Sequence, residues 1–314
     1  MSTSLNYRLI NIPFKSDLSK YPILDKFPSN QSFDLKLWRP NNDDRNRNSE
    51  ITILINGFME GVSLNGSTPS RKLYESIGLE LNNKNISAIH YPLPFHFERS
   101  KESNPIDRLK LSGSFLYYGG FSLVFEELNM LINDIIDNHE KYGLNENPKV
   151  HLLGYSLGGI AAVGVASEVA RLNSDFRFSS LSILLSAFNL NNVNPENISL
   201  AFRNAVTTED WQRVMSDLEG VKNDPTVSPI FKYLIWEIGE PIQFSKLAEK
   251  VLLLHGHNDE IFSADDAERL QRLVLDEMNQ CTFINVPSKH AVHFDREIIA
   301  RYISNFIISD FKSR

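Results

Sequence analysis

The spacing of hydrophobic positions changes along the chain, and each change predicts an element. Residues 33–38 alternate between inward and outward side chains, which is the period of a half-buried strand. Residues 51–55 and 86–91 are apolar at nearly every position, as expected for strands covered on both faces. Between them, residues 67–82 carry apolar side chains at helical spacing. The first hundred residues therefore predict strands and helices in alternation.

The alternation continues to residue 185 and resumes at residue 251. The further expected elements are helix 121–139, strand 150–153 with the helix after it, strand 181–185, strand 251–254, helix 264–278, strand 282–286 and helix 295–311. This order predicts an α/β protein with a mostly parallel sheet and helices on both faces. Residues 1–31 show no clear period, and we expect them to wrap the surface.

Residues 189–248 interrupt the alternation. They contain no convincing strand, but helical spacing occurs at 198–205, 208–218 and 229–238. Thr207 stands ahead of two acidic residues, which is typical of a helix start. Five aromatic residues of this segment are expected to be exposed: Phe202, Trp211, Phe231, Tyr233 and Trp236. We interpret residues 189–248 as a helical lid and residues 1–188 and 249–314 as the core domain, with simple packing of the aromatics as the alternative.

Composition narrows the class of protein. The 314 residues carry a net charge of -7 and no basic stripe, which argues against nucleic acid as the main partner. A single cysteine, Cys281, excludes an intramolecular disulfide and suits a reducing compartment. Residues 1–15 lack a secretory pattern, and no apolar stretch reaches the roughly 20 residues of a membrane span. We expect a cytoplasmic protein; its oligomeric state is not readable from these features.

A short glycine-rich motif follows strand 150–153. Gly154-Tyr155-Ser156-Leu157-Gly158 matches G-x-S-x-G between a strand and a helix, the context of a nucleophile elbow. A serine turned sharply out of a strand strains its own backbone, and the flanking elements come too close for Cβ atoms two positions before and after it. The alternative is a glycine-rich turn with an incidental serine. The partners of Ser156 must decide between the two.

A serine hydroxyl becomes a good nucleophile only when a base takes its proton and an acid orients that base. Strand 251–254 runs into Gly256, and Asp259 follows three residues later. His290 comes shortly after strand 282–286. The order Ser156, Asp259, His290 agrees with Ser…Asp…His.

With three motifs in this order, the chain resembles the α/β-hydrolase superfamily over roughly residues 32–312. The resemblance implies that Ser156 is the nucleophile, His290 the base and Asp259, in place of the adjacent Glu260, the acid. It also implies no metal and no organic cofactor. No glycine precedes His290, as the family usually has, and His293 is the alternative base. We expect His293 instead in the first turn of the last helix, with a capping or packing role.

An oxyanion hole needs two main-chain N–H donors. One should be Leu157, the residue after the nucleophile. The other should lie in the loop after strand 51–55, where Phe58 is the expected donor and Met59 the second choice. The family commonly has His-Gly at the start of this loop, whereas this chain has Asn56 and a glycine. We expect Asn56 to shape the loop through its own side-chain hydrogen bonds.

Two further groups of residues have open interpretations. His96 and Arg99 follow strand 86–91, where they could bind a charged or phosphate-bearing substrate or be ordinary surface-loop residues. His255 and His257, ahead of Asp259, resemble part of a zinc-hydrolase motif. That motif expects a histidine directly after the aspartate, but Glu260 stands there. We favour turn-bracketing roles for these two histidines.

The sequence predicts a serine hydrolase that cleaves a carboxylic ester or thioester through an acyl-enzyme. The aromatic residues of segment 189–248 favour a small-molecule substrate with an apolar acyl group. Fold alone does not fix the reaction. Acyl transfer and amide or peptide hydrolysis would use the same residues. A non-catalytic small-molecule binding protein that retains the pocket is the alternative from another class.

Overall fold

The computed structural model describes residues 7–21, 27–41, 48–57, 69–100, 120–186, 192–201, 207–225, 229–290 and 295–309. The strands are β1 (Tyr7–Lys15), β2 (Ser32–Pro40), β3 (Asn48–Ile55), β4 (Ser87–Tyr91), β5 (Leu144–Tyr155), β6 (Ser180–Leu184), β7 (Val251–Gly256) and β8 (Cys281–Val286). The longer helices are α2 (Pro69–Asn83), α4 (Gly120–Asp137), α5 (Leu157–Leu172), α7 (Thr208–Val221), α8 (Pro229–Trp236), α10 (Ala264–Leu275) and α11 (Arg296–Ile308). Shorter helical segments are α1 (Pro28–Gln31), α6 (Pro195–Ala201), α9 (Phe244–Leu247) and the 3₁₀ turns η2 (Phe97–Ser100) and η3 (His139–Tyr142).

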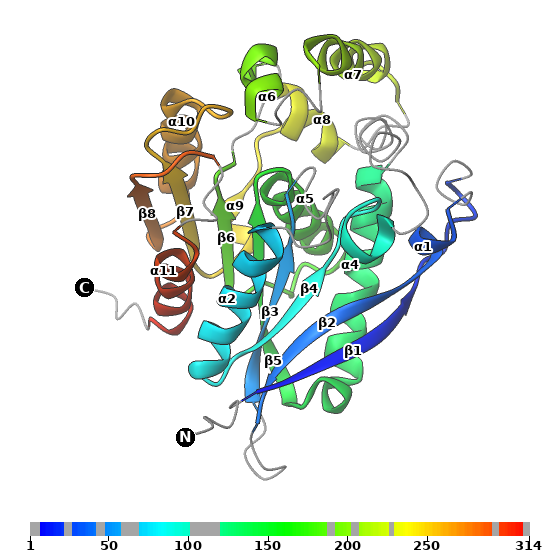
Figure 1. The fold of residues 1–314 in the computed structure, drawn as a ribbon, viewed down its shortest axis with the longest axis vertical. Coiled ribbons are helices and arrows are strands. Elements are labelled where there is room, and N and C mark those ends of the chain that lie inside the picture. The colour runs from blue at the N-terminus through cyan, green and yellow to red at the C-terminus, as the bar shows by residue number, and fades with distance from the viewer. Residues whose placement is uncertain are drawn as a thin grey trace.

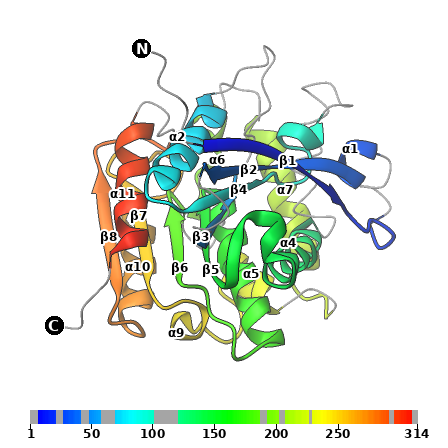
Figure 2. The ribbon, with the colours of Figure 1, turned by 90° about the horizontal axis from the view of Figure 1, so that it is seen from below.

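The eight strands form one sheet in the order β1-β2-β4-β3-β5-β6-β7-β8. Strands β3 to β8 run parallel, whereas β2 pairs antiparallel with both β1 and β4. The sheet is strongly twisted, so that β1 and β2 run across Figure 2 while β6, β7 and β8 run up it. The prediction of a mostly parallel sheet with helices on both faces is confirmed.

Two apolar cores lie on the two faces of the sheet. One contains the inner faces of α4 and α5, and the other those of α2 and α11 (Figure 1). Neighbouring residues in the central strands contribute to opposite cores: Ile53 belongs to the first and Leu54 to the second. Both side chains are fully buried. This explains why β3 is apolar at consecutive positions, as the sequence pattern indicated.

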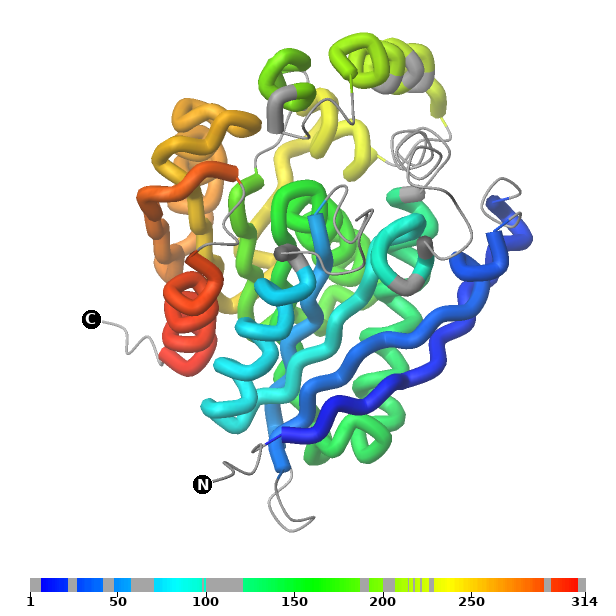
Figure 3. Tube along the Cα trace, viewed as in Figure 1, coloured from blue at the N-terminus to red at the C-terminus, as the bar shows by residue number. Residues whose placement is uncertain are grey.

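The N-terminal segment differs from the prediction. Instead of wrapping the surface, residues 7–15 form the edge strand β1, which pairs with β2 from Tyr7↔Pro40 to Lys15↔Ser32. Figure 3 shows this pair, in blue, at the edge of the sheet away from the red C-terminal helix. The alternation along β1 is blurred because Leu9 is 54% exposed. Pro13 also weakened the strand pattern, although a proline is tolerated on an edge strand.

The segment after β6 is helical, as predicted. Helices α6 to α9 lie there, and no strand occurs among its described residues. Thr207 begins α7 with a capping box that includes Asp210. Helices α6, α7 and α8 lie above the end of the sheet toward which β7 and β8 point (Figure 1). The carboxyl ends of the parallel strands are therefore the edge that faces α6, α7 and α8.

Of the aromatic residues of this segment that were expected to be exposed, the four that the structure describes are buried, so the prediction is wrong for them. Trp211, Phe231, Tyr233 and Trp236 are each at most 8% exposed and belong to the core shared with α4 and α5. The Phe231 ring lies 5.2 Å from that of Phe121 at the start of α4. These aromatic side chains therefore pack the segment onto the main domain, which was the alternative interpretation. Phe202 lies outside the described residues. No described helix combines the length and apolar character that a membrane crossing requires.

Candidate active site

The turn between β5 and α5 has the geometry of a nucleophile elbow. Ser156 has φ 53° and ψ -121°, a region that residues with a side chain rarely adopt. A Cβ on Gly154 would clash with the backbone of Gly158, and a Cβ on Gly158 would lie 2.5 Å from the carbonyl oxygens of Ile55 and Asn56. The steric reason given for glycine two residues before and two after Ser156 is confirmed.

The side chains of Ser156, His290 and Asp259 meet in one hydrogen-bonded chain. His290 Nε2 lies 2.9 Å from Ser156 Oγ. On the other side of the ring, Nδ1 lies 3.0 and 3.1 Å from the two carboxylate oxygens of Asp259. With the ring proton on Nδ1, the imidazole donates to Asp259 and leaves Nε2 to accept the serine proton. The structure thus brings Ser156 together with Asp259, 103 positions later in the sequence, and with His290, 134 positions later.

Strand order explains how these residues meet. Ser156 directly follows β5, and Asp259 and His290 follow β7 and β8 at the same edge of the sheet. The Asp259 carboxylate also accepts the N–H groups of Ile261 and Phe262 at 2.8 and 3.0 Å, and its side chain has no exposed surface. Because the loop itself holds the carboxylate, Asp259 presents both oxygens to the imidazole. The Phe262 ring packs 5.6 Å from the His290 ring.

The loop after β3 lies beside the elbow at the point where the strand order reverses. Ile55 pairs with Gly154, so the ends of β3 and β5 are adjacent, and ligands of open α/β sheets bind in such crevices. Asn56 is fully buried, and its side chain donates to the Gly57 carbonyl and accepts the Leu93 N–H, both at 2.8 Å. The predicted role of Asn56 in shaping the loop through its own hydrogen bonds is confirmed.

One of the two expected oxyanion donors is described. Leu157 is the first residue of α5, and the N–H groups of a first helical turn have no acceptor within the helix. Its N–H is therefore available at the helix N-terminus beside Ser156. Phe58 and Met59 lie outside the described residues, so the second donor stays a prediction. His293, the alternative base, also lies outside them.

His96 and Arg99 are not surface-loop residues, because both are fully buried. Arg99 forms an ion pair with Glu127 of α4, with Nη1 2.7 Å from Oε2 and Nη2 3.1 Å from Oε1. This pairing occupies the guanidinium and removes it as a binder of charged substrates. His96 bonds through Nδ1 to the Pro94 carbonyl, and burial lowers its pKa to about 4.

The histidines ahead of Asp259 have different surroundings. His255 is buried, and burial lowers its pKa, whereas His257 is exposed. Among the described residues, no group of three or more His, Cys, Asp or Glu side chains is placed to hold a metal ion. The carboxylate of Asp259 instead contacts the His290 ring. The arrangement fits turn-bracketing roles for His255 and His257.

Two residues that the sequence did not single out contact the backbone of His290. The Tyr155 hydroxyl donates to the His290 carbonyl at 2.5 Å, and the His290 N–H donates to Glu260 Oε2 at 3.1 Å. Each lies next to a predicted site residue, Ser156 or Asp259. Their position next to a site residue was the only indication in the sequence, because the sequence does not show which way the side chains of Tyr155 and Glu260 point.

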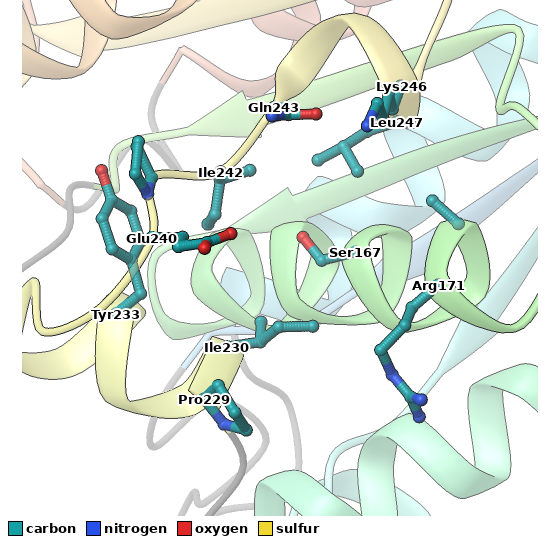
Figure 4. Close-up of a pocket in the computed structure, with 12 residues that line it drawn as sticks. Ser167, Arg171, Pro229, Ile230, Tyr233, Glu240, Ile242, Gln243, Lys246 and Leu247 are labelled. Atoms are coloured by element: carbon teal, nitrogen blue, oxygen red, sulfur yellow. The ribbon is translucent and has the colours of Figure 1, made fainter. Parts of the chain in front are cut away.

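A cavity of about 420 Å³ lies away from these side chains, between the C-terminal half of α5 and the segment from α8 to α9 (Figure 4). Ser167 and Arg171 line one wall, and Tyr233, Glu240 and Lys246 lie across from them. Neither Ser156 nor His290 lines this cavity. Its position at the opposite end of α5 from Ser156 separates it from the hydrogen-bonded chain.

Comparison with solved structures places this geometry in a known fold. The structure superposes on a cold-adapted esterase from an Arctic intertidal metagenomic library with a TM-score of 0.55 and 13% sequence identity. The match covers 97% of this chain and 96% of that one. An esterase of Pyrococcus furiosus gives a TM-score of 0.57 at 10% identity, over 96% of this chain and 93% of that one. An esterase of Pyrobaculum calidifontis gives 0.56 at 14% identity, over 96% and 86%.

No protein-family profile matches the sequence, and no curated protein sequence matches it either. The structural likeness nevertheless extends over almost the whole chain, which includes the eight-stranded, mostly parallel sheet and its helices. The chain has the α/β-hydrolase fold.

Proposed function

We propose that this protein is a serine hydrolase that cleaves a carboxylic ester or thioester of a small molecule. The observation that carries the proposal is the hydrogen-bonded chain from Ser156 Oγ through His290 to Asp259, at 2.9 Å and 3.0 Å. A strained serine at a helix N-terminus, in contact with an imidazole that a buried carboxylate orients, is the arrangement that acyl transfer to serine requires. The solved structures named above are esterases, which supports the same reaction class.

In the proposed reaction, Ser156 Oγ attacks the acyl carbon while His290 Nε2 takes the hydroxyl proton. Asp259 stabilises the imidazolium that forms. The N–H groups of Leu157 and Phe58 would stabilise the tetrahedral oxyanion. His290 then gives its proton to the leaving alcohol or thiol, and an acyl-enzyme remains. Water, deprotonated by His290, releases the acid and restores the serine.

We assign residues 189–248 as a lid over the core domain formed by residues 1–188 and 249–314. The support is positional, because helices α6 to α8 lie over the carboxyl edge of the sheet where Ser156 stands (Figure 1). We also propose a mainly apolar acyl group, on the general ground that small-molecule pockets are lined mostly by apolar side chains. The single thiol, Cys281, has a pKa raised to about 11 by burial, and an unreactive lone cysteine is compatible with the cytoplasm.

The direct test is a fluorophosphonate probe together with a panel of p-nitrophenyl esters and acyl-CoA thioesters of graded chain length. We expect rapid labelling and ester turnover by the wild type, and loss of both in Ser156→Ala, with kcat falling roughly 10⁴- to 10⁶-fold. Ser167→Ala is the matched control, because Ser167 lies on α5, the helix that begins after Ser156, and its hydroxyl donates to the Val163 carbonyl. Its activity should equal that of the wild type.

The same measurements separate the alternatives. A folded wild type that neither reacts with the probe nor hydrolyses any ester would leave a non-catalytic binding protein. Probe labelling without hydrolysis, together with transfer of the acyl group to an added alcohol or amine, would indicate an acyltransferase. Cleavage of p-nitroanilides at rates close to those of esters would indicate an amide or peptide hydrolase.

A further inference from the structure

We propose that Tyr155 and Glu260 are positioning residues that clamp the backbone of His290 and thereby set the distance between the imidazole and Ser156. The proposal rests on the proposed function, since it concerns the same site. The carbonyl of His290 accepts the Tyr155 hydroxyl at 2.5 Å, and its N–H donates to Glu260 Oε2 at 3.1 Å. We call these two contacts the His290 clamp.

The need for a clamp follows from where His290 lies. It stands four residues after the end of β8, outside any helix or strand, and is only 7% exposed. Its backbone groups therefore have no ladder or helix partner, yet a buried N–H or carbonyl that stays unpaired is costly. Side chains from two other segments supply the partners. The position of His290 is thus fixed by long-range contacts and not by its own loop.

The two clamp residues come from the segments that already hold the ring. Tyr155 immediately precedes Ser156, which contacts Nε2, and Glu260 immediately follows Asp259, which contacts Nδ1. Each segment therefore binds His290 twice, once at the imidazole and once at the backbone. A side chain held at both ends has little freedom to rotate or withdraw, so the Nε2–Oγ distance becomes a property of the β5 and β7 strand ends.

Tyr155 is itself rigidly placed. Its ring is 3% exposed and packs at the loop after β3, where a Cβ on Gly57 would lie only 2.8 Å from Tyr155 Cδ1. The ring also lies 5.7 Å from the His290 ring, at 34°. The hydroxyl therefore reaches the His290 carbonyl from a fixed ring. Functional side chains depend on such supporting contacts to keep their geometry.

Tyr155→Phe tests the clamp by removing only the hydroxyl. Proton transfer depends steeply on geometry, and losing one typical hydrogen bond should lower kcat for p-nitrophenyl butyrate roughly three- to ten-fold, with KM changed less than about two-fold. Turnover is expressed per serine titrated with the fluorophosphonate, so that misfolded protein does not count. Tyr142→Phe is the matched control, because it removes a hydroxyl that bonds to Asp134 at 2.5 Å, away from the site. An unchanged kcat in Tyr155→Phe overturns the proposal.

Glu260 is tested by rescue. Glu260→Ala removes the acceptor for the His290 N–H and should lower kcat roughly three- to ten-fold, whereas Glu260→Gln keeps a carbonyl oxygen there and should stay within about two-fold of the wild type. Glu168→Ala, which removes a surface partner of Arg171, is the control for loss of a glutamate. If the glutamine variant is as slow as the alanine variant, the acceptor role is wrong.

A readout without turnover separates this proposal from the proposed function. In protein labelled with ¹⁵N-histidine, the His290 amide should exchange slowly in the wild type and at least about ten-fold faster in Glu260→Ala. A wild type that hydrolyses no ester refutes the proposed function, while this exchange difference still identifies the clamp. Equal exchange in the two proteins refutes the clamp even if the wild type is an active esterase.

Discussion

Two of the buried polar clusters in the described part of the chain differ in whether their charges neutralise each other. One, which we call the serine cluster, consists of Ser156, His290 and Asp259 at the carboxyl edge of the sheet. The other, which we call the Arg99 cluster, joins η2, α4, β4 and the N-terminal segment. Its members are Arg99, Glu127, Tyr91, Ser16 and Asn30. Both clusters bring together residues that are distant in the sequence.

In the Arg99 cluster the charges neutralise each other. Arg99 makes two contacts with the Glu127 carboxylate, which also accepts the hydroxyls of Ser16 and Tyr91. Burial and the Glu127 carboxylate raise the pKa of Tyr91 well above its usual range. Every ionic group there is committed to a protein partner. In the proposed reaction, the serine cluster uses its single carboxylate to orient an imidazole that takes and returns a proton, so its hydrogen bonds rearrange as the substrate reacts.

Burial and charge therefore do not by themselves identify a reactive site. A network whose acids and bases are mutually satisfied stabilises one conformation, whereas a reactive network keeps a proton that can move. This comparison predicts opposite outcomes for carboxylate-to-amide substitutions in the two clusters.

The largest effect is expected for Asp259→Asn. An amide in this position favours the wrong imidazole tautomer, so kcat should fall by about 10³- to 10⁴-fold while the melting temperature changes little. Ester turnover and thermal unfolding of the same preparation provide the measurement. Glu127→Gln is the matched change in the Arg99 cluster, and its kcat per titrated serine should equal that of the wild type. A variant Asp259→Asn that retains near-normal kcat would remove the assigned role of Asp259.

The next effect is one of stability, in the Arg99 cluster. Glu127→Gln leaves the guanidinium buried without its counter-charge, and we expect a loss of about 3–5 kcal/mol in the free energy of unfolding. Urea denaturation measures it. Replacing both partners, as in Arg99→Met/Glu127→Leu, removes both buried charges and should cost clearly less than the sum of the single changes. Additive losses would show that the two charges do not stabilise each other.

The serine cluster could be predicted from the sequence because its members obey a local rule. Ser156, Asp259 and His290 each follow a strand, and all parallel strands end at one edge, so their position along the chain implies their proximity in space. The steric demand at Gly154 and Gly158 is equally local. Central strands such as β3 and β7 were predictable because burial on both faces makes each of them a nearly continuous apolar run.

The Arg99 cluster obeys no such rule. Arg99 lies in an irregular turn and Glu127 within a helix, and nothing in their spacing indicates that the two would meet in the core. Edge strand β1 was missed for a related reason, since one face of it is open and its alternation is blurred at Leu9. The buried aromatics, such as Trp236, looked exposed because their segment was considered without the helices that cover it.

His96, in the turn that carries Arg99, extends the comparison to pH. The His96 carbonyl accepts the Arg99 N–H, the whole residue is buried, and burial lowers its pKa from 6.5 to about 4. Because the folded protein keeps His96 neutral while the unfolded chain protonates it, its contribution to stability is complete above pH 6.5. It is lost as the pH falls from 6.5 to 4, by on the order of 3 kcal/mol in total.

The change His96→Gln retains a side-chain donor for the Pro94 carbonyl but removes this titration. We expect the free energy of unfolding of His96→Gln to fall less steeply than that of the wild type between pH 6.5 and 4, and to follow a parallel course above pH 7. Urea titrations at half-unit steps of pH measure the difference, with the exposed His257→Gln as the control. Parallel curves throughout would mean that His96 gains its proton without unfolding, and that the region around it admits water more readily than its complete burial indicates.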